Sequence, residues 1–186
     1  MPAGLEMVAT TRPYYRSAFV FVSRADRHLE LHSLDDPRLR ELRLGVQMIG
    51  DDGANAPPAH ALARRGIIDN VAGFPVYAAG GEQSPHRGII EAVANGDIDA
   101  ALVWGPVAGP LARLQPVPLL LAEVQPRIDG PTLPMMFDIS MGPAPRGRGT
   151  QARSRGGAEA AAEIDAILAE ARVPRLDLTR PAASVR

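Results

Sequence analysis

The chain has 186 residues and is 46% hydrophobic, which is enough apolar content to bury a sizeable core and excludes wholesale disorder. Its formal net charge of -1, from 20 basic and 21 acidic residues, argues against binding to nucleic acid through bulk charge. Every basic residue is arginine and there is no cysteine, so lysine-based chemistry, disulfides, thiolate nucleophiles and cysteine-ligated zinc are excluded.

The chain carries no predicted membrane or export segment. No apolar run approaches the roughly 18 residues that a membrane-spanning helix needs, so we expect no membrane insertion. The first residues, Met1 to Glu6, lack the basic region and the apolar stretch of a secretory signal peptide. As a prior, the length indicates one domain, or a two-lobed body without one of its pieces.

Short apolar runs separated by glycine and proline predict many compact elements. In chain order we expect a buried strand at 18–22, a short helix after Pro37, a strand at 42–49, a helix from 57 to 66, a strand at 71–77, a helix from 84 to 96, and strands at 100–104, 117–121 and 135–141. Strands that alternate with helices of about a dozen residues predict an α/β fold with a largely parallel sheet.

The last part of the chain changes in composition. Residues 142–157 are rich in glycine, arginine, proline and serine, which is typical of a flexible linker. A helix with one apolar stripe then follows and ends near Val173 and Pro174; its stripe is formed by Ile164, Ile167, Leu168 and Ala171.

The turn Gly50-Asp51-Asp52-Gly53 leads from a predicted strand into a predicted helix. Such a turn points backbone N–H groups and the positive end of the helix outward, which favours an anion or a polar ligand. Alternatively, Asp51 and Asp52 cap the helix themselves. The turn has neither the lysine of a phosphate-binding loop nor the third glycine of a dinucleotide fingerprint, which argues against nucleotide binding.

Aromatic residues suggest a second part of a site. Trp104-Gly105 follows the most apolar strand, and ligands of open α/β sheets lie beyond the carboxyl ends of strands. Trp104 therefore either forms the floor of a pocket or packs under a loop. Tyr14 and Tyr15, beside Arg12 and Arg16, either line a cleft or pack at a strand edge.

Other polar residues do not form a familiar catalytic or metal pattern. Four histidines lack acidic partners at metal-ligand spacing, and the serines lack the Gly-x-Ser-x-Gly context of a nucleophile elbow; the histidines are His28, His32, His60 and His86. The pairs Asp51/Asp52 and Asp97/Asp99 fit cap and turn roles better than a glycosidase pair. We predict no catalytic residue, no metal and no cofactor.

Several segments resemble the type II periplasmic solute-binding proteins. The stretch from Thr10 to Val22 is similar to the strand by which that family crosses from the first lobe into the second. The segments at 33–36 and 44–47 resemble the start of the second lobe, and 94–103 resembles the step from helix to strand that closes its site.

A more specific resemblance is to solute-binding-like accessory proteins associated with quinoprotein (PQQ-dependent) methanol or alcohol dehydrogenases. The motifs that carry it are Arg12-Pro13-Tyr14-Tyr15-Arg16-Ser17, the run from Gly45 to Leu62, Trp104-Gly105-Pro106 and the run from Ala162 to Leu168. The resemblance covers residues 4 to about 142 and 160 to 178.

The resemblance implies a second lobe with its crossover strands and a C-terminal helix, with the first lobe largely missing. The implied division is a crossover from the absent lobe at 1–17, an α/β second lobe at 18–136, a return crossover and flexible linker at 137–157, a C-terminal helix at 158–178 and a disordered tail at 179–186. Amino-acid receptors of the wider family place an aspartate where Trp104-Gly105 stands here, so an amino-acid ligand is not expected.

The implied function is that of a non-enzymatic periplasmic protein that contacts the dehydrogenase or binds a small solute between two lobes. Two alternatives remain: a receptor that delivers a small solute to an ABC permease, and a small α/β enzyme that uses Asp51 or Asp52 as a base. The predicted ligand-binding residues are Arg12, Tyr14, Tyr15, Gly50, Asp51, Asp52, Gly53, Trp104 and Gly105.

Overall fold

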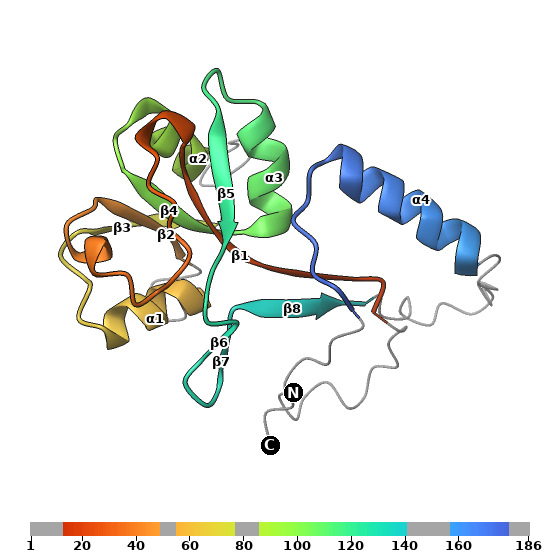
Figure 1. The fold of residues 1–186 in the computed structure, drawn as a ribbon, viewed down its shortest axis with the longest axis horizontal. Coiled ribbons are helices and arrows are strands. Elements are labelled where there is room, and N and C mark those ends of the chain that lie inside the picture. The colour runs from red at the N-terminus through yellow and green to blue at the C-terminus, as the bar shows by residue number, and fades with distance from the viewer. Residues whose placement is uncertain (1–12, 49–54, 77–85, 141–156, 179–186) are drawn as a thin grey trace.

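The computed structural model describes residues 13–48, 55–76, 86–140 and 157–178 (Figure 1). Its centre is a six-stranded sheet in the order β3-β2-β4-β1-β5, and β8 also pairs with β1. The strands of this sheet are β1 (Tyr15–Arg24), β2 (Leu44–Met48), β3 (Val71–Pro75), β4 (Ala100–Trp104), β5 (Leu119–Glu123) and β8 (Met136–Ile139). A separate two-stranded ribbon consists of β6 (Ile128–Asp129) and β7 (Leu133–Pro134).

The helices predicted at 57–66, at 84–96 and near the C-terminus are present with shifted ends, whereas the helix at 105–113 was not predicted. The helices are α1 (Pro57–Arg64), α2 (Arg87–Asn95), α3 (Gly105–Arg113) and α4 (Gly157–Glu170), with short 3-10 helices η1 (Ala25–Arg27) and η2 (Pro37–Arg40). Asp36 caps η2, because its carboxylate accepts a hydrogen bond of 3.0 Å from the backbone N–H of Arg38. Gly96 ends α2 in the left-handed conformation that glycine adopts without steric cost.

The prediction of a largely parallel sheet is wrong. Strand β2 is parallel to β3 and to β4, but β1 is antiparallel to β4, β5 and β8. Strands β4 and β5 both run opposite to β1 and are therefore parallel to each other, as expected for two strands joined through α3. The alternation of strands and helices predicts this relation, but it does not reveal that an earlier strand lies between them.

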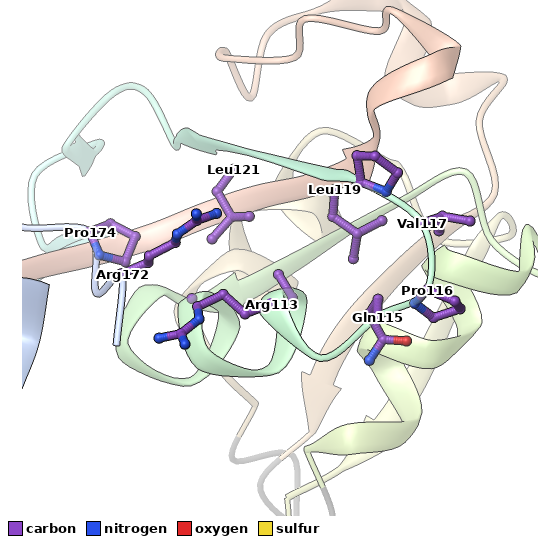
Figure 2. A pocket seen from close by; sticks show the side chains of 11 residues that line it. Arg113, Gln115, Pro116, Val117, Leu119, Leu121, Arg172 and Pro174 are labelled. Atoms are coloured by element: carbon purple, nitrogen blue, oxygen red, sulfur yellow. The ribbon is translucent and has the colours of Figure 1, made fainter. Parts of the chain in front are cut away.

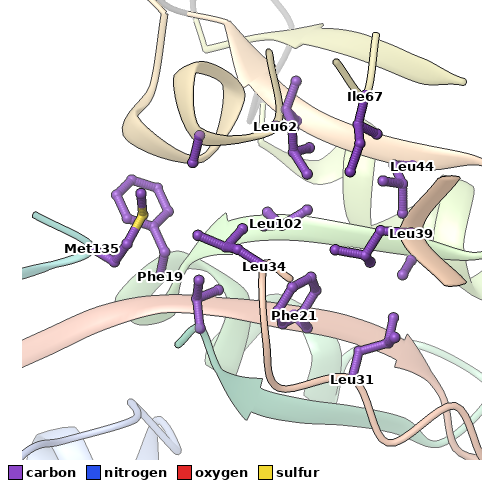
Figure 3. Close-up of a cluster of buried hydrophobic side chains, with 14 of the residues drawn as sticks. Phe19, Phe21, Leu31, Leu34, Leu39, Leu44, Leu62, Ile67, Leu102 and Met135 are labelled. Carbon is purple, nitrogen blue, oxygen red and sulfur yellow. The ribbon is translucent and has the colours of Figure 1, made fainter. Parts of the chain in front are cut away.

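Hydrophobic cores cover both faces of the sheet. On one face, Phe19 and Phe21 of β1 pack with Leu102 of β4, Leu62 of α1 and Leu39 of η2 (Figure 3). On the other face, alternate residues of the same strands pack against α2 and α3; this cluster includes Val20, Val22, Val103, Ile89, Ile90, Val93 and Ala108. Coverage of both faces explains why residues 18–22 of β1 and all residues of β4 are apolar.

The first half of β1 leaves the main body and is held by two other segments. Residues Tyr15 to Ala18 pair with β8, and Arg16 forms an ion pair with Asp138, with a second guanidinium nitrogen 2.9 Å from the other carboxylate oxygen. The chain after α4 returns to this strand, because the Ser17 hydroxyl donates to the carbonyl of Pro174 at 2.6 Å and the N–H of Leu176 donates to the carbonyl of Arg16 (Figure 1).

We predict that Leu102→Ala lowers the free energy of unfolding by about 2–5 kcal/mol, the usual cost of a cavity at a buried leucine. Leu102 is fully buried in the core of the sheet. The matched control is Leu114→Ala at a side chain that is 70% exposed, which should change stability by less than about 0.5 kcal/mol. Denaturant unfolding of both variants measures the difference, and equal losses would contradict this assignment of the core.

Candidate functional site

The carboxyl ends of β2 and β4 meet at one edge of the sheet. These two strands are parallel neighbours, with Val46 opposite Leu102, so Met48 and Trp104 end at the same edge. Helix α3 begins at Gly105, directly after Trp104. Ligands of open α/β sheets bind beyond this edge, which makes it the candidate site.

A buried glutamine joins three elements at this edge. The amide oxygen of Gln47 accepts a hydrogen bond from the backbone N–H of Trp104 at 3.2 Å, and its amide nitrogen lies 2.8 Å from Nδ1 of His86, just before α2. The Gln47 side chain is 4% exposed, so both ends of the amide are used inside the protein. We assign the amide nitrogen as the donor to Nδ1, which places the proton of neutral His86 on Nε2.

Burial lowers the pKa of His86 below its ordinary value, because the desolvated imidazolium is less favourable than the neutral ring. The neutral form is also the one that accepts the hydrogen bond from Gln47. Geometry and desolvation therefore favour the same uncharged state.

Three aromatic rings form an edge-to-face cluster beside this network, which we call the aromatic patch. The ring of Trp104 lies 5.4 Å from Phe19 and 5.7 Å from Phe137 between ring centres, and Phe19 lies 6.5 Å from Phe137. Phe19 is buried and Phe137, on β8, is 39% exposed. Trp104 thus packs on its own protein while the patch presents an apolar surface that spans β4 and β8.

The structure describes four of the predicted site residues. Trp104 lies in the aromatic patch, and a Cβ added to Gly105 would lie 2.7 Å from the carbonyl oxygen of Ala18, so this glycine permits close packing of α3 on β1. Tyr14 and Tyr15 contact each other edge-to-face at 5.2 Å, and burial raises the pKa of Tyr15. Within the described part of the chain, no ring contact joins these tyrosines to Trp104.

The remaining predicted site residues lie outside the described residues, and they are Arg12, Gly50, Asp51, Asp52 and Gly53. The residues on either side of the predicted turn are described. Met48 and Asn55 form an antiparallel bridge at the end of β2, so both flanks of the turn lie at the same sheet edge as Trp104. The roles of the turn residues as ligands or as a catalytic base stay predictions.

One cavity lies at the candidate site, and a larger one lies away from it. The first, of about 210 Å³, lies beside the end of β2, and its lining includes Met48, Asn55 and Ala59. The larger one, of about 440 Å³, lies between α3, β5 and the segment that follows α4 (Figure 2). The larger cavity is therefore not at the edge where strand topology places the site.

Sequence reasoning missed Gln47, His86 and Phe137. A polar residue inside the otherwise apolar strand 44–48 was a usable signal for Gln47, because a buried amide requires partners. His86 and Phe137 carried no comparable signal, since only the fold brings them to the ends of β2 and β4. No group of three or more acidic or histidine side chains suited to a metal occurs in the described ranges.

No protein-family model matches the sequence. Protein MoxJ of Methylorubrum extorquens is 28% identical over 92% of this chain, and Protein MoxJ of Paracoccus denitrificans is 31% identical over 94% of it. The crystal structure of the periplasmic binding protein XoxJ from Methylobacterium extorquens AM1 is 29% identical and superposes with a TM-score of 0.68 over 91% of this chain and 74% of that one.

The chain is thus similar in sequence to the MoxJ and XoxJ proteins and shares the fold of XoxJ. MxaJ from Methlophaga aminisulfidivorans, at 21% identity and a TM-score of 0.64 over 93% of this chain and 73% of that one, shares the fold. These matches confirm the predicted α/β fold of the periplasmic-binding-protein type. The chain spans 59% and 65% of the lengths of the two MoxJ relatives. None of the described helices is long and apolar enough to cross a membrane.

We predict that Gln47→Met lowers the free energy of unfolding by about 1–3 kcal/mol, because the N–H of Trp104 and Nδ1 of His86 then lose a buried partner. The change should also shift the fluorescence of Trp104, which is the one tryptophan of the chain. The control is Gln115→Met, whose amide bonds only a carbonyl of its own helix turn. An unchanged emission spectrum with unchanged stability would refute the bridging role of Gln47.

We also predict that stability falls as pH drops through the ordinary histidine value of about 6.5. The pKa of His86 is lowered in the folded state, so the unfolded chain binds a proton that the folded chain resists, and acid favours unfolding. Above that pH, His86 is neutral in both the folded and the unfolded state, and its effect on the free energy of unfolding vanishes. His86→Gln should reduce this slope in pH-dependent unfolding, whereas His60→Gln, at an exposed position of α1, should retain it.

Proposed function

We propose that the protein is a non-enzymatic, periplasmic-binding-like accessory protein of a quinoprotein methanol or alcohol dehydrogenase system, and that it acts in the periplasm by contacting the dehydrogenase. The sequence resemblance to accessory proteins of such dehydrogenases supports this proposal, as does similarity to MoxJ and XoxJ. The single observation that carries the mode of action is the aromatic patch at the edge where this fold usually holds a ligand.

The described residues of this edge favour a protein surface over a charged solute. The described residues that line it are neutral, namely Gln47, Met48, Asn55, His86 and Trp104. An amino-acid ligand needs a carboxylate for its ammonium group and a cation for its carboxylate. Gln47 is also committed at both ends of its amide.

The exposed part of the aromatic patch suits a contact between proteins. Aromatic residues are enriched in interface cores, because a rigid ring buries much apolar area at little cost in conformational entropy. Phe137 lies on β8, and its position is fixed by pairing of that strand with β1 and by contact with Trp104. A partner that covers Phe137 would therefore meet a preorganised apolar surface.

A second candidate function is binding of a small solute for an ABC permease. The specific observation in its favour is the side-chain oxygen of Asn55, which is buried without a hydrogen-bond partner in the described structure. Asn55 lines the cavity of about 210 Å³ at the end of β2. A buried acceptor without a partner costs free energy unless a ligand or water supplies the donor.

The test of the proposed function is binding of the full chain to a purified quinoprotein methanol dehydrogenase, measured by biolayer interferometry. We expect Phe137→Ala to weaken binding at least about tenfold, which corresponds to about 1.4 kcal/mol. Leu120→Ala removes a side chain of similar exposure, 43% against 39%, from β5 and should leave affinity unchanged.

The same preparation is titrated with small solutes by calorimetry to separate the two candidates. Tight binding of one solute, abolished by Asn55→Ala, together with no affinity for the dehydrogenase would establish the receptor function and overturn the accessory role. Equal dehydrogenase affinity of Phe137→Ala and the unaltered chain would exclude the aromatic patch as the contact.

A further inference from the structure

The groove between α3 and β5 is separate from the aromatic patch. Its cavity of about 440 Å³ is bounded by Leu119 and Leu121 on one side and by the small residues Gly109 and Ala112 of α3 on the other (Figure 2). The segment after α4 closes one end with Arg172 and Pro174, and residues 115–118 close the other. The volume lies within the range of about 300–1,000 Å³ that ligand sites occupy.

One side of this groove is the free edge of the sheet. Strand β5 is last in the strand order and pairs with β1 alone. The N–H of Ala25 donates to the carbonyl of Pro118, and the N–H of Val124 donates to the carbonyl of Phe19. Because hydrogen-bonded pairs alternate along an antiparallel ladder, the even-numbered residues of β5 bond β1. The backbone N–H and C=O groups of Leu119, Leu121 and Glu123 therefore face away from the sheet, and none of them is bonded within the described residues.

The end of the groove that Arg172 and Pro174 close is positively charged. Arg172 has neither an ion pair nor a side-chain hydrogen bond in the described part of the chain, and none of the residues that line the cavity is acidic. The Arg113 side chain, also in the lining, donates to the backbone carbonyl of Glu170 and so keeps its full charge.

The position of Arg172 is fixed by its backbone. Its N–H donates to the carbonyl of Ala169 at 3.0 Å, and its own carbonyl oxygen lies only 2.3 Å from where a Cβ of Gly109 would stand. The segment therefore packs directly on α3 at a glycine, which places Arg172 at the end of the groove.

We propose that this groove docks an extended acidic segment of another protein, which adds a strand to the free edge of β5, inserts apolar side chains above α3 and pairs a carboxylate with Arg172. Strand addition satisfies outward backbone groups of an edge strand, and alternate side chains of the added strand enter the pocket beneath. An unpaired guanidinium beside an apolar pocket selects a carboxylate by charge-assisted hydrogen bonds.

The free edge favours a peptide over a small carboxylic acid. A small acid would use the apolar pocket and Arg172 but would leave the backbone groups of Leu119 and Leu121 unbonded. Edge strands are usually protected by charge, proline or a bulge, whereas Leu119 to Ala122 of β5 carry neither charge nor proline, and Leu120 is exposed on the other face. These features together indicate an edge that another chain covers.

The test uses the full chain and a labelled peptide in which valine alternates with threonine and which ends in aspartate, with binding followed by fluorescence anisotropy. Two N-methylated versions, each methylated along one backbone edge, remove the hydrogen bonds of that edge. We expect binding of the parent peptide and of one methylated version, with loss of binding for the other. Absence of any binding, or equal binding of both methylated versions, would overturn strand addition.

Charge pairing is tested by Arg172→Gln, at an exposed residue whose side chain makes no hydrogen bond or ion pair within the described residues. The substitution should lower the affinity for the aspartate peptide at least about fivefold and leave the affinity for a peptide that ends in asparagine unchanged. This is the pattern of a direct pairwise interaction. The matched control is Arg87→Gln on α2, whose guanidinium pairs with Glu91 away from the groove.

Ala112→Phe provides a second variant, because it fills the groove from α3 and should abolish peptide binding. Hexanoate that competes fully with the peptide while both methylated versions still bind would assign the groove to small acids and reject the proposal. Self-association of the chain that disappears in Ala112→Phe would assign it to a second copy and reject the proposal equally. Dehydrogenase binding through Phe137 is read out separately and does not depend on these results.

Discussion

Strand β1 is the element on which the rest of the structure depends, because both of its edges and both of its faces are occupied. Its second half pairs with β4 on one edge and β5 on the other, and its residues from Arg16 to Ser23 are buried. Such a strand contributes to two hydrophobic cores at once. Loss of β1 would separate β5 and β8 from the parallel unit β3-β2-β4, because both pair with the sheet through β1.

The same strand connects the body with the segments around its first half. Pairing with β8 positions Phe137 against Trp104, and the bond of Ser17 to Pro174 positions the chain after α4 against α3. The aromatic patch and the groove at β5 thus both depend on contacts of one strand. The buried Arg16 guanidinium adds to these contacts, because it donates two hydrogen bonds to the partly exposed carboxylate of Asp138.

Helix α3 relates the two proposed surfaces to each other. It begins at Gly105 beside the aromatic patch, and its later residues Gly109, Ala112 and Arg113 line the groove. The two glycines allow β1 and the segment after α4 to approach the helix more closely than any side chain would permit. A partner protein that contacts the patch at one end of α3 is therefore within one short helix of the groove at the other end.

Local sequence patterns were sufficient to predict most of the described helices and strands. The apolar run at 18–22, the strand at 100–104 and the helix that Gly96 ends were predictable, because side-chain periodicity and glycine caps act over a few residues. The position of Trp104 at a carboxyl strand end followed from the same reasoning, and the resemblance to periplasmic binding proteins gave the fold type.

Long-range pairing decided the rest. The antiparallel insertion of β1 between β4 and β5 depends on which strand edges meet, and local periodicity carries no information about that choice. The side chain of Gln47 bonds Trp104, which is 57 positions away in the sequence, and His86, which is 39 positions away. Arg172, whose side chain has no partner among the described residues, reaches the groove because Gly109 allows the segment after α4 to pack on α3. Hydrogen bonds and close packing of this kind arise from tertiary structure, because they require two distant segments to be in place at once.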